Sequence, residues 1–364
     1  MAKLAIYRKY RPKLFSEFIG QEHITRTISN AIVGNMVSHA YLFSGPRGTG
    51  KTTLARLLAK AVNCENLNGF EPCNKCASCK EIDSNRAMDL VEIDAASNRG
   101  IDDIRELRDN ARFIPSKLKY KVFIIDECHQ LSNAASNALL KTLEEPPKHA
   151  IFILATTEIY KMLATILSRC QRFDFKKLSV SEIIEKIEKD AKAEKVKIDK
   201  AALKLIAQAA RGSIRDAESM LDQVLTFNPD KIIEAQEVKT ILGLIETQVI
   251  SQLIDLLLQK DKKQSIIFLN KTLERGLDAK ELNKAIINYL RQGLIIKVAS
   301  GENDLGLELT EQEIEKLKTQ ISSIEQEQII KALDIFIDAN SKIRYSPIPQ
   351  LPIELAILSS CEIL

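Results

Sequence analysis

The stretch from Ser44 to Thr53, which reads SGPRGTGKTT, carries the clearest chemistry in this sequence. It matches the pattern G-x-x-x-x-G-K-[ST], in which glycines let the backbone turn tightly and point its N–H groups at a triphosphate. Lys51 supplies a positive charge for the β- and γ-phosphates, and Thr52 offers a hydroxyl group to Mg²⁺. A chance glycine-rich turn is the alternative, but it would not explain a match at every motif position. The residues expected to contact the nucleotide are Gly45, Pro46, Arg47, Gly48, Thr49, Gly50, Lys51, Thr52 and Thr53.

Two adjacent carboxylates follow a short apolar run further along the chain. Val122 to Ile125 is typical of a buried strand, and Asp126 and Glu127 come directly after it. Ligands bind at the carboxyl ends of strands in parallel α/β sheets, so we expect Asp126 to hold Mg²⁺ and Glu127 to polarise an attacking water. Adjacent acidic residues are also common on surfaces, but the preceding strand and the phosphate loop favour the catalytic interpretation.

Four cysteines are spaced C-x8-C-x2-C-x2-C, and the residues between them are polar turn formers with no core of their own. Four thiolates at this spacing can surround one Zn²⁺. With four protein ligands the ion has no open position, so we expect a structural zinc and not a catalytic one. The alternative is a cluster of free thiols. The predicted zinc ligands are Cys64, Cys73, Cys76 and Cys79.

The surrounding sequence predicts an α/β domain that positions these groups. A short apolar run from His39 to Phe43 leads into the phosphate loop, and Leu54 to Val62 has helical spacing after it, which is the strand, loop and helix order that the motif requires. Ala150 to Ala155 predicts another buried strand, which delivers Thr156 to the same sheet edge. Further elements are expected as helices at Glu22–Gly34, Ile101–Ala111 and Asn133–Glu145, and as strands at Asp89–Asp94 and Arg172–Phe175.

The chain changes character from Leu178 onward, where helices rich in Ile, Ala, Glu and Lys are predicted. The stretch that begins at Arg211 opens one of these helices. From Leu244 to Leu364 the helical periodicity continues without a cluster of catalytic groups, and 303–309 is expected to be a loop. The third segment is therefore predicted to be a helical bundle.

Length and composition limit the possible functions. A chain of 364 residues is expected to hold two or three domains, and 45% hydrophobic with 28% charged residues is ordinary for a globular protein. The net charge of +3 means that any contact with nucleic acid depends on local placement of Lys and Arg. Because Trp is absent and aromatic residues make up 5%, base stacking on an aromatic surface is not expected. The basic start MAKLAIYRKYRP has no apolar signal stretch and no run suits a membrane span, so we expect a cytoplasmic protein.

Several motifs together resemble the ATPase subunits of bacterial clamp loaders, the DNA polymerase III gamma/tau family of AAA+ proteins. The motifs are YRKYRP, GPRGTGKTT, the four-cysteine insert, VFIIDE, ALLKTLEEPP, ILATTE and LSRC. The resemblance is specific from about Tyr7 to Arg215 and looser beyond. It implies that Thr156 is a first sensor, that Arg215 is a second sensor in a helical lid, and that Arg169 is an arginine finger. Such a finger reaches the γ-phosphate held by a neighbouring subunit.

Several of these residues also have simpler interpretations. The basic and aromatic segment that includes Tyr7 and Arg11 could wrap the adenine, or it could pack on the core as an N-terminal arm. Taken alone, Arg169 could be a surface charge, and Arg215 could be an arginine facing solvent in the first turn of its helix.

The resemblance also implies a domain organisation and a function. We expect an ATPase domain at 1–177 with a zinc module at 64–79, a helical lid at 178–242 and a helical collar for oligomerisation at 243–364. The expected function is an ATPase motor with ATP, Mg²⁺ and Zn²⁺ as cofactors, which loads a sliding clamp onto primed DNA together with other clamp-loader subunits. A non-hydrolysing scaffold subunit is one rival, although the intact phosphate loop disfavours it. Another ring motor, such as a branch-migration helicase, is disfavoured by the cysteine insert and LSRC.

Overall fold

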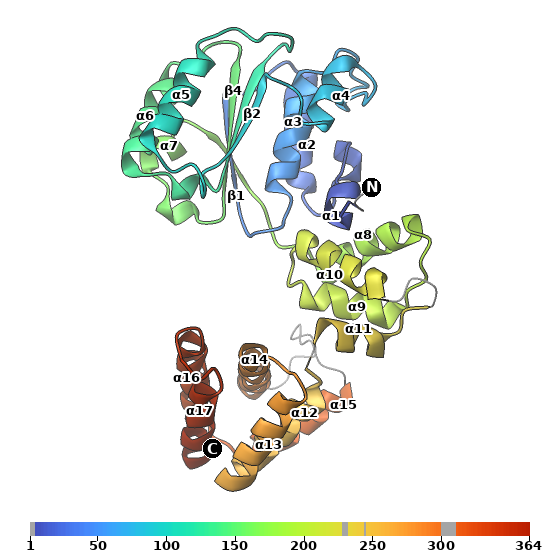
Figure 1. Cartoon of the computed structure of the whole chain (residues 1–364), viewed down its shortest axis with the longest axis vertical. Coiled ribbons are helices and arrows are strands. Elements are labelled where there is room, and N and C mark those ends of the chain that lie inside the picture. The colour runs from blue at the N-terminus through green and yellow to red at the C-terminus, as the bar shows by residue number, and fades with distance from the viewer. Residues whose placement is uncertain (1–3, 228–231, 244, 300–310) are drawn as a thin grey trace. The chain divides into compact units, whose positions relative to one another are not determined.

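Among residues 4–227, 232–243, 245–299 and 311–364, which are those that the computed structural model describes, five parallel strands form one sheet (Figure 1). Its order is β2-β3-β4-β1-β5. The central strands are buried on both faces, which explains their continuous apolar sequences. The register pairs Ser44 with Thr156 and Asp94 with Asp126, so the polar residues that end these strands lie at one edge. The strands are β1 Ala40–Ser44, β2 Leu90–Asp94, β3 Lys121–Asp126, β4 Ala150–Thr156 and β5 Gln171–Asp174.

Helices cover both faces of this sheet, as Figure 1 shows. Because side chains alternate along a strand, Tyr41 and Phe43 of β1 pack toward α2 and α3, whereas Leu42 packs toward α5 and α6. The helices of the first face are α2 Glu22–Val33 and α3 Lys51–Val62, and those of the second are α5 Ile101–Ala111, α6 Asn133–Glu144 and α7 Ala164–Leu167. The sheet is thus the middle layer of a three-layer α/β domain.

Three further helices form a small lid that belongs to the same unit, Met1–Ala235. They are α8 Val180–Ala193, α9 Lys200–Ala209 and α10 Ile214–Phe227. The short N-terminal helix α1, Ile6–Lys9, packs against α10 (Figure 1). Between α1 and α2 lies the 3₁₀ turn η1, Phe15–Glu17, and the cysteine segment carries α4, Ala77–Asp83.

The second unit, Gln236–Leu364, is helical over its described residues. Its core gathers apolar side chains such as Leu257, Ile286, Phe336 and Ile357. In the part of the chain that the structure describes, no single helix is long and apolar enough to cross a membrane. The helices α11 and α12 are long and apolar enough only when they are counted together as a bent pair, by length and composition alone. The helices are α11 Ala235–Leu242, α12 Thr247–Leu258, α13 Lys262–Glu274, α14 Ala279–Val298, α15 Glu311–Ser322, α16 Gln326–Ile343 and α17 Leu351–Ile363.

The predicted fold class, a phosphate-loop α/β domain followed by a helical lid and a C-terminal helical domain, is confirmed, but some element bounds differ. The helix after the phosphate loop begins at Lys51 and not at Leu54, because the loop leads directly into its first turn. The helix predicted to open at Arg211 begins at Ile214, since Arg211 and Gly212 have left-handed φ angles of 51° and 90°. The loop predicted at 303–309 lies outside the described residues.

Candidate active site

The phosphate loop joins β1 to α3 at the carboxyl edge of the sheet. Its turn depends on glycine: Gly48 has a φ of 75°, and a Cβ atom there would lie 1.9 Å from Oγ of Ser213 in the lid. The backbone N–H of Ile214 donates to the carbonyl oxygen of Gly48 at 3.0 Å. The loop is therefore in direct backbone contact with the start of α10.

Lys51 opens α3 and is largely buried. Its Nζ donates to the carbonyl oxygens of Gly45 and Pro46, each at 2.8 Å, so the ammonium group lies inside the curve of the loop. Burial lowers the pKa of Lys51, and the nearby carboxylates of Glu127 and Asp126 oppose that effect. This arrangement places a cation where phosphate oxygens would be held.

Thr52 and Asp126 come from α3 and β3 and meet at the same edge. The Thr52 hydroxyl donates to Oδ2 of Asp126 at 2.6 Å, and the other oxygen of Asp126 accepts from the backbone N–H of Glu127 at 2.9 Å. A hydroxyl and a carboxylate are hard oxygen donors, which Mg²⁺ prefers. The donor set therefore fits a magnesium ion, and the residues that would hold it are Thr52 and Asp126.

Glu127 lies one residue further and has an unusual backbone. Its φ of 47° is left-handed, a conformation that is costly for a residue other than glycine and that often occurs at functional sites. Its carboxylate accepts from the Thr157 hydroxyl at 2.9 Å and from the Thr157 backbone N–H at 3.3 Å. The ring of His129 is 3.4 Å away, so three groups restrict this carboxylate.

Thr156 ends β4 beside these residues and is fully buried. Its Oγ1 lies 3.0 Å from Nδ1 of His129 and accepts from the backbone N–H of Glu158 at 3.0 Å. His129 therefore lies between Thr156 and Glu127. His129 was not predicted to be a site residue, although it follows Glu127 by two residues in the sequence.

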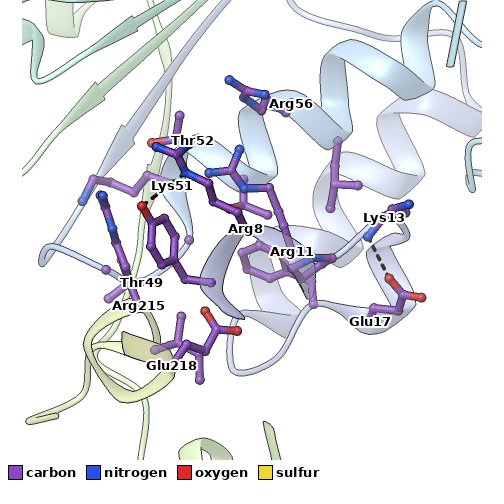
Figure 2. Close-up of a pocket in the computed structure, with 18 of the residues that line it drawn as sticks. Arg8, Arg11, Lys13, Glu17, Thr49, Lys51, Thr52, Arg56, Arg215 and Glu218 are labelled. Atoms are coloured by element: carbon purple, nitrogen blue, oxygen red, sulfur yellow. Dashed lines mark hydrogen bonds between the residues drawn. The ribbon is translucent and has the colours of Figure 1, made fainter. Parts of the chain in front are cut away.

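Lys51, Thr52, Asp126 and Glu127 border a cavity of about 850 Å³, a size suited to a nucleotide (Figure 2). Most of the predicted site residues line it, whereas Gly45 and Pro46 do not, although their carbonyl oxygens accept hydrogen bonds from Lys51. Thr156 and Arg169 are not among the lining residues. The predicted residues that line the cavity are Tyr7, Arg11, Arg47, Gly48, Thr49, Gly50, Lys51, Thr52, Thr53, Asp126, Glu127 and Arg215.

The N-terminal arm and the lid form the remaining wall of the cavity. The guanidinium group of Arg215 lies over the ring of Tyr7, 5.0 Å from its centroid, and Figure 2 shows Arg215 facing the cavity close to the phosphate loop. Burial lowers the pKa of Arg11, and the charge of Arg56 lowers it further. A negatively charged ligand beside Arg11 would relieve this cost.

Sequence reasoning missed a buried ionic cluster where the arm meets the lid. Nζ of Lys186 lies 2.6 Å and 2.8 Å from the two oxygens of Asp190 and 3.0 Å from Oε1 of Glu218, and it donates to the carbonyl oxygen of Tyr10 at 3.2 Å. Burial raises the pKa of Asp190, and it raises the pKa of Glu218 to about 7. The ammonium group of Lys186 thus forms ion pairs with two buried carboxylates. Lys186 itself could have indicated this cluster from the sequence, because it is a charged residue on the apolar face of its helix, between Ile183 and Ile187.

Arg169 lies away from the cavity, at the end of α7. It forms an ion pair with Glu144 at 2.6 Å and donates to the carbonyl oxygen of Thr165 at 2.7 Å. About a third of its side chain is exposed. The structure therefore does not bring Arg169 together with the phosphate loop of its own chain.

The four cysteines converge beside α3. Their sulfur atoms all lie within 4.8 Å of one another, and a tetrahedral zinc centre with Zn–S bonds of about 2.3 Å would place its sulfurs roughly 3.8 Å apart. Backbone N–H groups of Lys75 and Cys76 donate to the sulfur of Cys73 and lower its pKa to about 6, whereas burial raises the pKa of the Cys64 and Cys79 thiols. The donor set therefore fits a zinc ion held by Cys64, Cys73, Cys76 and Cys79.

Comparisons with family models match almost the whole chain. Residues 20–179 match the model described as DNA polymerase III, delta subunit. Residues 182–229 match the DNA polymerase III clamp loader subunit, ATPase lid domain, and residues 233–363 match DNA polymerase III subunits gamma and tau domain III.

Individual relatives agree with these models. The chain is 44% identical to DNA polymerase III subunit tau of Bacillus subtilis over 100% of its own length and 64% of the relative's. It is 36% identical to DNA polymerase III subunit gamma of Buchnera aphidicola, covering 96% of each. The chain thus spans less than two thirds of the tau relative. A solved structure of a Thermotoga maritima RuvB variant, 23% identical, superimposes with a TM-score of 0.50 over 78% of this chain and 91% of that one, which shows a similar fold.

Proposed function

The chain belongs to the DNA polymerase III gamma/tau family, and from this we propose that it is an ATP-driven motor subunit of a bacterial clamp loader. In this proposal ATP binding opens a sliding clamp, and contact with primer-template DNA stimulates hydrolysis and releases the closed clamp. The partners would be other clamp-loader subunits, the clamp and the DNA, in the cytoplasm where bacterial DNA is replicated.

The observation that carries the proposal is the meeting of Lys51, Thr52, Asp126 and Glu127 at one sheet edge beside a cavity of about 850 Å³. Lys51 would hold the β- and γ-phosphates, while Thr52 and Asp126 would hold Mg²⁺, which neutralises phosphate charge when bound. Glu127 would orient the attacking water and accept its proton. The contacts of Thr157 with Glu127 keep that carboxylate near the cavity wall.

Two more groups would sense the nucleotide. Thr156 contacts His129, which lies 3.4 Å from Glu127, so Thr156 would respond to the nucleotide through these two residues. Arg215 lines the cavity from the lid, and a γ-phosphate would draw its guanidinium away from the ring of Tyr7. Tyr7 and Arg11 would enclose the nucleotide from the arm.

Arg169 would act on the site of a neighbouring subunit. It lies outside the cavity of its own chain and is paired with Glu144 on a partly exposed surface. A partner's γ-phosphate would compete with this carboxylate for the guanidinium group. Because an arginine finger typically accelerates hydrolysis about 10³- to 10⁵-fold, hydrolysis would then depend on assembly.

The proposed domains follow the same division of roles. We assign the ATPase domain to 1–177 with a zinc module at 64–79, the lid to 178–242 and the collar that joins subunits to 243–364. Zinc would be structural, because four cysteines leave no open ligand position. The similarity to RuvB concerns the fold alone and does not support a branch-migration motor. A scaffold without hydrolysis would not need the complete set of phosphate, magnesium and base residues.

The test is steady-state ATP hydrolysis by this chain reconstituted with clamp-loader partner subunits, with and without clamp and primed DNA. Wild type is compared with Arg169→Ala and with Arg172→Ala, a control that removes an exposed arginine three positions along, paired with Asp174. We expect strong stimulation by clamp plus DNA, lost in Arg169→Ala while ATP binding persists, and retained in the control. Equal rates with and without DNA in all three proteins would refute the proposal.

A further inference from the structure

We propose that Glu71, which lies inside the four-cysteine segment, positions one wall of the nucleotide cavity, so that zinc and nucleotide strengthen each other's binding. The inference rests on the zinc and nucleotide sites proposed above. It assigns to the cysteine segment a role in the ATP site of the same chain.

Glu71 contacts the N-terminal arm with both carboxylate oxygens. Oε2 accepts from the backbone N–H of Phe15 and Oε1 from the backbone N–H of Ser16, each at 2.8 Å. These are the first two N–H groups of η1, which have no partner within the turn itself. A carboxylate that accepts from two adjacent N–H groups forms strong, directional hydrogen bonds. Glu71 therefore fixes the start of η1 from a segment more than fifty residues away in sequence.

The turn that Glu71 fixes leads directly into the cavity wall. Phe18 follows η1, and a Cβ atom added to Gly50 would lie 2.5 Å from Cζ of its ring, so the ring packs on the backbone of the phosphate loop. Glu17, Phe18 and Ile19 all line the cavity. A shift of η1 would move the Phe18 ring away from Gly50, the residue that precedes Lys51 in the phosphate loop.

A second contact supports the same attachment. The ring of Phe70 meets the buried ring of Phe15 edge to face, with centroids 6.2 Å apart. Phe70, the residue before Glu71, thus packs on Phe15, the first residue of η1, beside the hydrogen bonds that Glu71 accepts from the same turn.

The position of Glu71 depends on the cysteines on either side of it. Residues 65–69 are exposed, and the segment's own structure is a bridge in which Asn68 and Glu71 exchange two backbone hydrogen bonds of 3.0 Å. Cys64 and Cys73 bracket this turn, and the backbone N–H of Cys73 donates to the sulfur of Cys64 at 3.2 Å. Phe70 and Pro72 pack inward, but residues 65–69 bury little surface, so metal at Cys64 and Cys73 would hold the two ends of the turn together.

The cysteine segment, Glu71, η1, Phe18 and the phosphate loop therefore form one continuous set of contacts. Metal that orders the turn keeps Glu71 on η1 and the wall closed around the nucleotide. By linkage, nucleotide that closes the wall must strengthen zinc binding by the same factor.

The first experiment measures the Kd of a fluorescent, non-hydrolysable ATP analogue for the whole chain, with zinc content determined by mass spectrometry. Wild type, Glu71→Gln and Glu65→Gln are each compared before and after chelation. Glu65 is the matched control, since it lies in the same turn but accepts only from Ser78 within the segment. Because hydrogen bonds to a charged acceptor are worth about a factor of ten in an equilibrium constant, we expect chelation to weaken wild-type binding roughly tenfold. Glu71→Gln should be weakened similarly with zinc still bound, and chelation should then add little.

The second experiment keeps the inference testable even where the metal-free chain unfolds. Zinc release into a chromophoric chelator is timed with and without the ATP analogue. Nucleotide should slow release in wild type and Glu65→Gln, but not in Glu71→Gln. A merely structural Glu71 would change the release rate without changing its dependence on nucleotide.

The outcomes separate this inference from the proposed sites. If wild type carries no zinc or binds no nucleotide, the proposed sites fail and the inference fails with them. If wild type does both, but Glu71→Gln matches it in nucleotide affinity and in the effect of nucleotide on zinc release, the inference alone is overturned.

Discussion

The buried cluster of Lys186, Asp190 and Glu218 makes the stability of the lid depend on pH. Burial raises the pKa of Glu218 from its ordinary value of 4.5 to about 7. Between these two values the folded lid retains a proton that the unfolded chain releases, so the free energy of unfolding decreases as pH rises. Below pH 4.5 the contribution of Glu218 to the free energy of unfolding is fully present, and above about pH 7 it is lost. Since a difference of one in pKa is worth about 1.4 kcal/mol, the loss should reach on the order of 3 kcal/mol.

The change that tests this is Glu218→Gln, because the amide resembles the protonated acid and does not titrate. Asp190 would keep its two contacts with Lys186, so the cluster should survive. Hydrogen exchange of α8, measured by mass spectrometry, reports local opening in a helix whose sequence is identical in both proteins. Between pH 4.5 and 8, protection in the variant relative to wild type should rise about a hundredfold.

The control is Glu185→Gln, which breaks an exposed pair with Lys189 on the same helix. Exposed pairs of this kind contribute about 0.3–0.5 kcal/mol, so its effect should be small at every pH. A protection ratio for Glu218→Gln that stays constant across this range would refute the reasoning. So would the same rise in the control.

Three further outcomes are expected. Thr157→Val removes the 2.9 Å hydrogen bond to Glu127 and should lower kcat about tenfold with little change in KM. Thr157→Ser keeps the hydroxyl group and should keep the wild-type kcat. Equal kcat in both variants would contradict a positioning role. Lys51→Ala should abolish measurable binding of a fluorescent ATP analogue, because the loop loses its buried cation. The circular dichroism spectrum of the variant should match that of wild type. If the variant bound the analogue with wild-type affinity, the phosphates would bind elsewhere. Cys76→Ser should retain less than about a tenth of the wild-type zinc by mass spectrometry, and undiminished zinc would exclude the four-sulfur site.

Short-range pattern was enough to predict the elements that carry the site. The buried run before Asp126 predicted β3, and the helix expected at Ile101–Ala111 has those bounds in the structure. The start of α10 was predicted too early, because Arg211 is not a residue type that signals a left-handed backbone. Helix caps and left-handed residues depend on local contacts that composition and periodicity do not report.

Within the site, sequence and structure contributed different residues. Residue type and fixed spacing were enough to predict Lys51, Thr52, Asp126 and the four cysteines. The structure places the first three beside the cavity and the cysteines within one cluster. No spacing rule connects Lys186 with Glu218, and they meet only because α8 and α10 pack together.

The sequence by itself therefore determined the phosphate loop, the acidic strand end and the cysteine cluster, since each is built from residues close together in the chain. Tertiary structure alone decided that Thr157 holds Glu127 and that Glu71 joins the cysteine segment to η1. These contacts join elements that are distant in sequence, so their geometry follows from how the layers pack and not from any local pattern of residues.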